Sequence, residues 1–161
     1  MTAKIVGLTR YPRKGEPGVS APEMNLLEGI GIEGDFHRGG AGQVSLLSTE
    51  VRQWVEAQTR KGLCFGRFRE NILIEGLVGG WPLEALRSGT LLSLGGAALE
   101  IGVHSKRCHA ECERFAEEIP CRLAGCVCFA VVEQSGTVRI GDAVMLIKGK
   151  DDTPNAEHDA F

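Results

Sequence analysis

The stretch that decides the fold is Ser88–Ser105, SGTLLSLGGAALEIGVHS. It contains two apolar runs of strand length on either side of Gly95-Gly96, which is the pattern of a β-hairpin. The chain contains further short apolar runs on either side of this stretch: Lys4–Thr9 (KIVGLT), Val44–Leu47 and Val127–Val132. Runs of this kind, bounded by glycine and proline, predict strands.

The rest of the chain supports a mainly β fold. The 22 glycines are scattered singly and in pairs, which indicates many turns between short strands. Ser48 precedes a helical pattern in which Val51, Trp54 and Val55 share one face, so a helix is predicted from Ser48 toward Lys61-Gly62. The polar pair before Ile72-Leu73-Ile74 opens a further strand. Residues 138–146 form the last strand segment, with a turn between strands expected at Gly141-Asp142. The prediction is a closed or nearly closed β-barrel with one or two short helices.

Other segments are predicted to be irregular. Residues 11–23 carry three prolines and two glycines and are expected to form a loop, as is the glycine-punctuated segment 29–40. Residues 108–115 are expected to form a helical turn anchored by Phe115. We expect one domain over residues 1–148 and a disordered polar tail over 149–161.

Composition and charge exclude several classes of function. With 43% hydrophobic and 24% charged residues the chain is ordinary for a globular protein. A net charge of −3 gives no overall attraction to nucleic acid or to a membrane surface. We find no export signal, no transmembrane segment and no phosphate-binding loop, so a cytoplasmic protein without a nucleotide fold is expected. The six cysteines are then expected to be reduced.

Cysteine is concentrated in one part of the chain, because five of the six lie between Cys108 and Cys128. Three interpretations are open: a reactive thiolate, a structural zinc or iron–sulfur site, or small core residues. Lys106, Arg107 and His109 surround Cys108 and would favour its thiolate form. Cys126 and Cys128, on an apolar strand, are expected to be core residues, as is Cys64. Cys112 and Cys121 are open between the second and third interpretations.

Two polar motifs accompany the cysteines. In Gly34-Asp35-Phe36-His37, Asp35 can orient His37 or can cap backbone amides of a turn. In Glu70-Asn71, the Asn71 amide offers both donors and acceptors, either to a ligand or to a turn. Some cations are candidates for binding an anionic group: Arg38, Arg67, Arg69, Lys106 and Arg107.

These motifs together resemble the MOSC family, named for the C-terminal domain of molybdenum cofactor sulfurases. The resemblance covers about Gly31–Ile147 and rests on elements in the expected order. These are GIEGDFHRGG (31–40) followed by QVSLLSTE (43–50), GRFRENILIEGL (66–77), the strand pair before the cysteine, and HSKRCHAEC (104–112) with Cys121 and SGTVRIGDAV (135–144). After Cys121 the chain departs from the small stand-alone members, which tend to carry Met-Pro-Arg-Glu-Gly where it has Arg122-Leu-Ala-Gly-Cys-Val.

The resemblance implies a β-barrel-rich fold and a cysteine, matched by Cys108, that carries sulfur as a persulfide or ligates molybdenum. Asp35 and His37 would position the ligand or move protons, and Arg69, Asn71, Lys106, Arg107 and His109 would bind a molybdopterin-type anionic cofactor. A cysteine desulfurase or a molybdoenzyme would be the protein partner.

Two other functions are open. One is a non-catalytic module in which Cys108, Cys112 and Cys121, with His104 or His109, hold zinc or an iron–sulfur centre. The other is a MOSC-like binding domain with degenerate chemistry.

Overall fold

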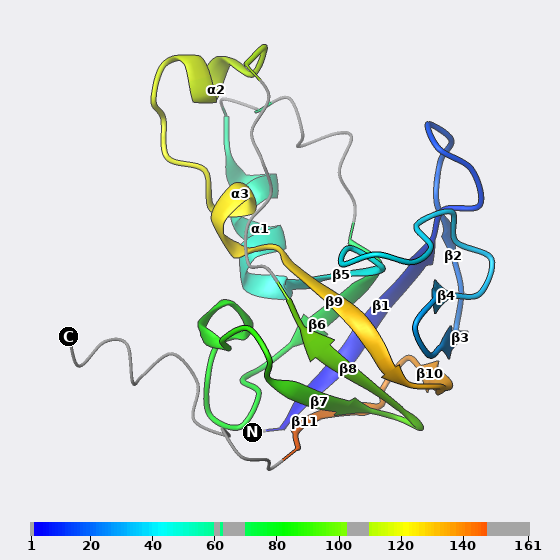
Figure 1. Ribbon diagram of the computed structural model, residues 1–161. Helices are drawn as coiled ribbons and strands as arrows, with labels where there is room; N and C mark the ends of the chain where they lie inside the picture. The colour runs from blue at the N-terminus through cyan, green and yellow to red at the C-terminus, as the bar shows by residue number, and fades with distance from the viewer. Residues whose placement is uncertain (1, 60–61, 63–69, 103–109, 148–161) are drawn as a thin grey trace.

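The fold is a β-barrel with a small three-stranded sheet and a group of short helices at its side (Figure 1). The computed structural model describes residues 2–59, 62, 70–102 and 110–147. The barrel strands are β1 (Ala3–Arg10), β5 (Val44–Ser48), β6 (Ile72–Glu75), β7 (Leu91–Leu94), β8 (Ala97–Ile101), β9 (Cys128–Gln134) and β11 (Ala143–Leu146). The other strands are β2 (Val19–Ser20), β3 (Glu23–Leu27), β4 (Gly31–Ile32) and β10 (Gly136–Arg139).

The barrel closes through its first and last strands. The strand order is β11-β7-β8-β9-β5-β6-β1, and β1 returns to β11 with Ala3 opposite Val144. All these pairs are antiparallel except β5–β6, which is parallel and has Leu46 opposite Ile72. Closure removes the unpaired edges that an open sheet would expose. The predicted mainly β barrel is therefore confirmed.

Alternation along the strands builds two apolar clusters. On β5 and β6, Leu46 and Ile74 point into the barrel, whereas Leu47 and Leu73 point outward. The outward side chains pack under α1 (Thr49–Ala57), mainly against Val51 and α3 (Arg122–Cys126). Both faces of these strands are thus buried, which explains why they read as continuous apolar runs.

Most predicted elements are confirmed. The hairpin at Gly95-Gly96 joins β7 to β8 in register, with Leu94 opposite Ala97. Ser48 is the N-cap of α1, and its hydroxyl accepts the Val51 N–H at 3.2 Å. The 29–40 segment is irregular apart from the two-residue β4.

Four predicted boundaries are wrong. α1 ends at Ala57 rather than near Lys61-Gly62, because the next backbone, at Gln58, is extended. The 11–23 loop contains β2, which pairs with the end of β1. The segment 138–146 is not one strand but parts of two, β10 and β11, although the turn predicted at Gly141-Asp142 does separate them. Cys126 ends α3 and does not share a strand with Cys128.

Phe115 was expected to anchor its helical turn and does not. It lies in α2 (Glu113–Ala116) and its side chain is 53% exposed. The neighbouring Arg114 is buried instead, with its guanidinium 5.2 Å from the centre of the Trp54 ring and a hydrogen bond to the Pro120 carbonyl. Within the described residues, no helix is long and apolar enough to cross a membrane.

Close backbone packing at Gly136 gives a test of the barrel. A Cβ there would meet the Gly96 carbonyl and the Ala97 nitrogen, which are backbone atoms that cannot rotate away. We expect Gly136→Ala to lower the free energy of unfolding by about 1–3 kcal/mol. The control is Gly125→Ala in α3, where nothing lies within 4 Å, and a gain of up to about 1 kcal/mol is expected. Urea unfolding of both variants checks this, and equal effects would contradict it.

Candidate functional site

The loop after β4 holds Asp35 and His37 as a hydrogen-bonded pair. Asp35 Oδ1 lies 2.8 Å from His37 Nδ1 and also accepts the His37 N–H at 2.8 Å. The Asp35 side chain is 0% exposed, whereas that of His37 is 45% exposed. Since a carboxylate only accepts, Nδ1 carries the proton, and Nε2 has no protein hydrogen-bond partner among the described residues.

Phe36 covers one face of the imidazole. Its ring centre lies 3.9 Å from that of His37 with an angle of 32° between the planes, and the Tyr11 ring meets His37 edge-on at 6.5 Å. The Phe36 N–H donates to the Tyr11 carbonyl, which ties the loop to the end of β1. The ring orientation of His37 is thus set both by Asp35 and by its aromatic neighbours.

The second carboxylate oxygen of Asp35 accepts hydrogen bonds from two donors. Oδ2 accepts the Tyr11 N–H at 2.8 Å and the Asn71 side-chain amide at 3.0 Å. With the two bonds from His37, the carboxylate accepts four hydrogen bonds inside the protein. Burial of a charge is tolerated when it is hydrogen-bonded in this way. Both sequence interpretations of Asp35 are therefore realised, because it orients His37 and also caps backbone amides.

The Asn71 amide joins three segments of the barrel. Its Nδ2 donates to the Thr9 carbonyl and to Asp35, both at 3.0 Å, and its Oδ1 accepts from the Ser45 N–H and hydroxyl at 3.0 and 3.1 Å. Asn71 is 2% exposed. Two donors and two acceptor positions are all occupied within the protein. The arrangement makes Asn71 a positioning residue for Asp35 rather than a group directed at a ligand.

A buried ion pair lies beside Asn71. Arg52, on α1, donates to Glu70 at 2.5 Å, and both side chains are nearly inaccessible. The pair fixes α1 to the residue that precedes Asn71. Removing one partner of such a pair leaves an uncompensated buried charge, which is strongly unfavourable.

Several predicted site residues lie outside the described residues, and the leading cysteine, Cys108, is one of them. They are Arg69, Lys106, Arg107, Cys108 and His109. Of the cysteines proposed as alternative metal ligands, Cys112 is buried and precedes α2, and Cys121 is half-buried and precedes α3. Within the described part of the chain, no three His, Cys, Asp or Glu side chains come together to hold a metal ion. The structural-metal alternative stays a prediction, because its ligand set includes Cys108.

The last two cysteines belong to apolar surroundings. Cys128 is in the barrel core, and burial raises the pKa of its thiol to about 12. Burial, and secondarily the Glu84 carboxylate, also raises the pKa of Cys126, against the opposing effect of Arg122. Both thiols are therefore protonated at neutral pH and poorly nucleophilic. The expectation that Cys128 is a core residue is confirmed, and Cys126 packs against the cluster beneath α1.

Two residues of this site were missed in the sequence. Ser45 bonds Asn71 with its hydroxyl and backbone, and Tyr11 donates its N–H to Asp35. A serine inside the apolar run Val44–Leu47 was a usable signal, because a buried hydroxyl requires a partner. The Tyr11 hydrogen bond could not be predicted from the sequence, because its donor is a backbone N–H that every residue except proline carries.

The chain belongs to the MOSC domain family, whose pattern matches residues 33–145. Solved structures with the same fold include the YuaD protein from Bacillus subtilis, 22% identical with a TM-score of 0.63, covering 89% of this chain and 94% of that one. YiiM from Escherichia coli is 18% identical with a TM-score of 0.60, covering 96% of this chain and 74% of that one. At these identities the likeness concerns the fold. No curated protein matches the sequence.

The hydrogen bonds of Asn71 can be tested by removing them. We expect Asn71→Ala to lower the free energy of unfolding by about 3 kcal/mol, since it deprives the buried Asp35 carboxylate and the Ser45 N–H of partners. Asn25→Ala is the matched control, because Asn25 is exposed and bonds Glu33 at the surface. Its effect should stay within about 0.5 kcal/mol. Urea unfolding gives both values, and similar losses would contradict the role of Asn71.

Proposed function

We propose that this MOSC domain acts with the molybdenum cofactor, using Cys108 as a thiolate that carries sulfur as a persulfide or ligates molybdenum. The observation that carries the proposal is the Asp35–His37 pair, in which a buried, fully bonded carboxylate holds an imidazole that is 45% exposed. A rigid imidazole with one fixed nitrogen and one accessible nitrogen is suited to proton transfer and to ligand positioning.

The surroundings of the pair fit a large anionic ligand. Gly39 and Gly40 have φ of +70° and +68°, and a Cβ on either would meet nothing within 4 Å. Bare backbone of this kind permits close approach of a ligand. The exposed Arg38 follows His37 directly. Imidazole and guanidinium groups are donors appropriate to the phosphate and pterin parts of the cofactor.

The last described residue before Cys108 in the chain, Gly102, lies near the same loop. Gly102, at the end of β8, donates its N–H to the Phe129 carbonyl at 2.8 Å and lies beside Ala41, four residues after His37 in the sequence. The segment containing Cys108 follows Gly102. The neighbours Lys106, Arg107 and His109 favour the thiolate, as the sequence indicates.

Within this proposal each group has a separate task. When bound, the cofactor would supply a metal centre able to exchange sulfur or oxygen ligands. His37 gives or takes a proton at Nε2, Asp35 keeps Nδ1 protonated, and Asn71 keeps Asp35 in place. A cysteine desulfurase or a molybdoenzyme would be the partner that delivers or receives sulfur.

Differential reactivity of the cysteines tests the role of Cys108. We expect Cys108 to react with iodoacetamide at pH 7 at least tenfold faster than Cys128, whose raised pKa keeps it as the thiol. We also expect labile sulfur or molybdenum in the purified protein and its loss in Cys108→Ala. Cys126→Ala is the matched control and should retain both.

Two results of these measurements would contradict the proposed role of Cys108. Sulfur and molybdenum unchanged in a folded Cys108→Ala variant, as judged by circular dichroism, would exclude the proposal. Stoichiometric zinc or iron whose removal unfolds the protein would favour the structural-metal module.

A further inference from the structure

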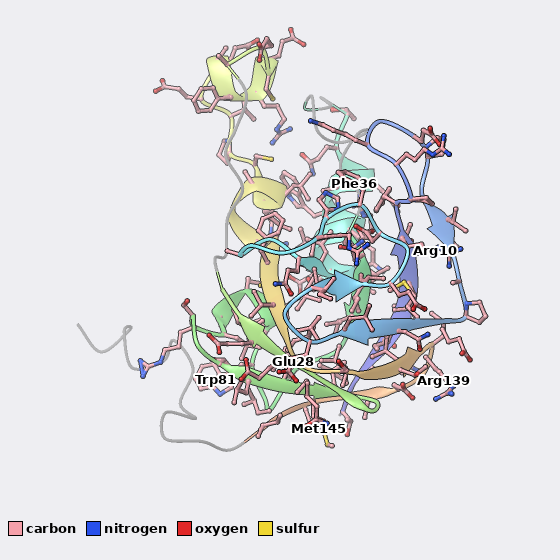
Figure 2. The ribbon with its side chains drawn as sticks, turned by 45° about the vertical axis from the view of Figure 1, so that its right-hand side comes forward. Arg10, Glu28, Phe36, Trp81, Arg139 and Met145 are labelled. Atoms are coloured by element: carbon pink, nitrogen blue, oxygen red, sulfur yellow. The ribbon has the colours of Figure 1, made fainter. Side chains whose placement is uncertain are left out.

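Arg10 is a half-buried cation that the Asp35–His37 pair does not use. It is the last residue of β1, two positions after the core residue Leu8, so its side chain leaves the strand on the same face as the barrel interior. Figure 2 shows Arg10 and Phe36 on the same side of the molecule, away from Trp81 and Met145. Arg10 therefore lies where the barrel interior meets the loop that carries His37.

The loop leaves space for this side chain at Gly34. Gly34 has φ of +86°, and a Cβ built there would lie 3.2 Å from Arg10 Cδ and 3.3 Å from Arg10 Nε. A side chain at this position would be strained and would press on the arginine. Gly34 thus permits Arg10 to lie against the backbone directly before Asp35.

The Arg10 guanidinium has no carboxylate partner in the described part of the chain. Other arginines there form ion pairs, namely Arg13, Arg52, Arg122 and Arg139. The Asp35 carboxylate accepts four hydrogen bonds from Tyr11, His37 and Asn71, so its acceptor positions are already used. A half-buried arginine without a carboxylate partner among these residues is suited to bind an oxyanion.

We propose that Arg10 binds an oxyanion of the phosphate class at this loop, with His37 Nε2 as a second donor when the imidazole is protonated. Arg10 lies against residue 34 and His37 is bonded to residue 35, so the two groups flank one short segment. In the context of the proposed function, on which its biological meaning rests, the oxyanion is the phosphate group of the cofactor. The binding site itself depends only on the described residues.

Titration with inorganic phosphate, followed by the amide resonances of Tyr11 and His37, tests this site. We expect saturable shifts in the parent protein and at least a tenfold loss of affinity in Arg10→Gln. Arg10→Lys, which keeps the charge but not the planar fork, should fall between them. Arg139→Gln is the matched control, because it removes the same charge from an arginine on β10 that is paired with Glu23 on β3. This variant should bind phosphate like the parent protein.

A second variant acts through the loop. Gly34→Ala should weaken phosphate binding by displacing Arg10, whereas parent-like affinity would contradict the placement of the arginine. Absence of phosphate binding in the parent, equal affinity in a folded Arg10→Gln, or an equal loss in Arg139→Gln would overturn the proposal.

The failure of this proposal can be separated from failure of the proposed function. Labile sulfur and molybdenum are measured in the same Arg10→Gln preparation and in Cys108→Ala. Arg10-dependent phosphate binding without sulfur or metal at Cys108 would leave the oxyanion site standing and remove the cofactor role. Sulfur or metal at Cys108, together with phosphate binding that does not depend on Arg10, would support the cofactor role and remove the oxyanion site at Arg10.

Discussion

The Asn71 side chain is the contact on which the site depends. Its amide connects β5 through Ser45, the end of β1 through Thr9, and the loop that carries His37 through Asp35. Each partner would lose one hydrogen bond without this side chain, so the penalty for losing it is shared by three segments. The position of His37 follows, because Asp35 has no freedom to move.

The barrel and this hydrogen-bond network support one another. Asn71 immediately precedes β6, which pairs with β1 and with β5, and its backbone N–H also donates to the Ser45 carbonyl. The backbone pairing alone therefore fixes the register of the strands on both sides of the network. The Arg52–Glu70 pair adds α1 to the same rigid unit. A site supported by strands in this way is held more precisely than one built on loops alone.

Among the described residues, the Asp35 carboxylate pairs with His37 and not with Arg10. The carboxylate is satisfied by donors from its own chain, whereas the guanidinium lies beside Gly34 and retains its donors. Direct pairing of the two would have neutralised both. Their separation leaves an acceptor that fixes the imidazole and a cation that is available to an external anion.

The sequence by itself determined the barrel class, the hairpin at Gly95-Gly96 and the Ser48 cap, and it marked Asp35 as a residue that orients His37 or caps backbone amides. These features depend on local spacing, alternation and turn chemistry, which a single segment carries. Only the tertiary structure decided that Arg114 rather than Phe115 is buried, that Asn71 is used internally, and that Arg10 lies beside Gly34. Each of these depends on a contact between segments far apart in the chain, and such contacts impose no periodicity on either segment.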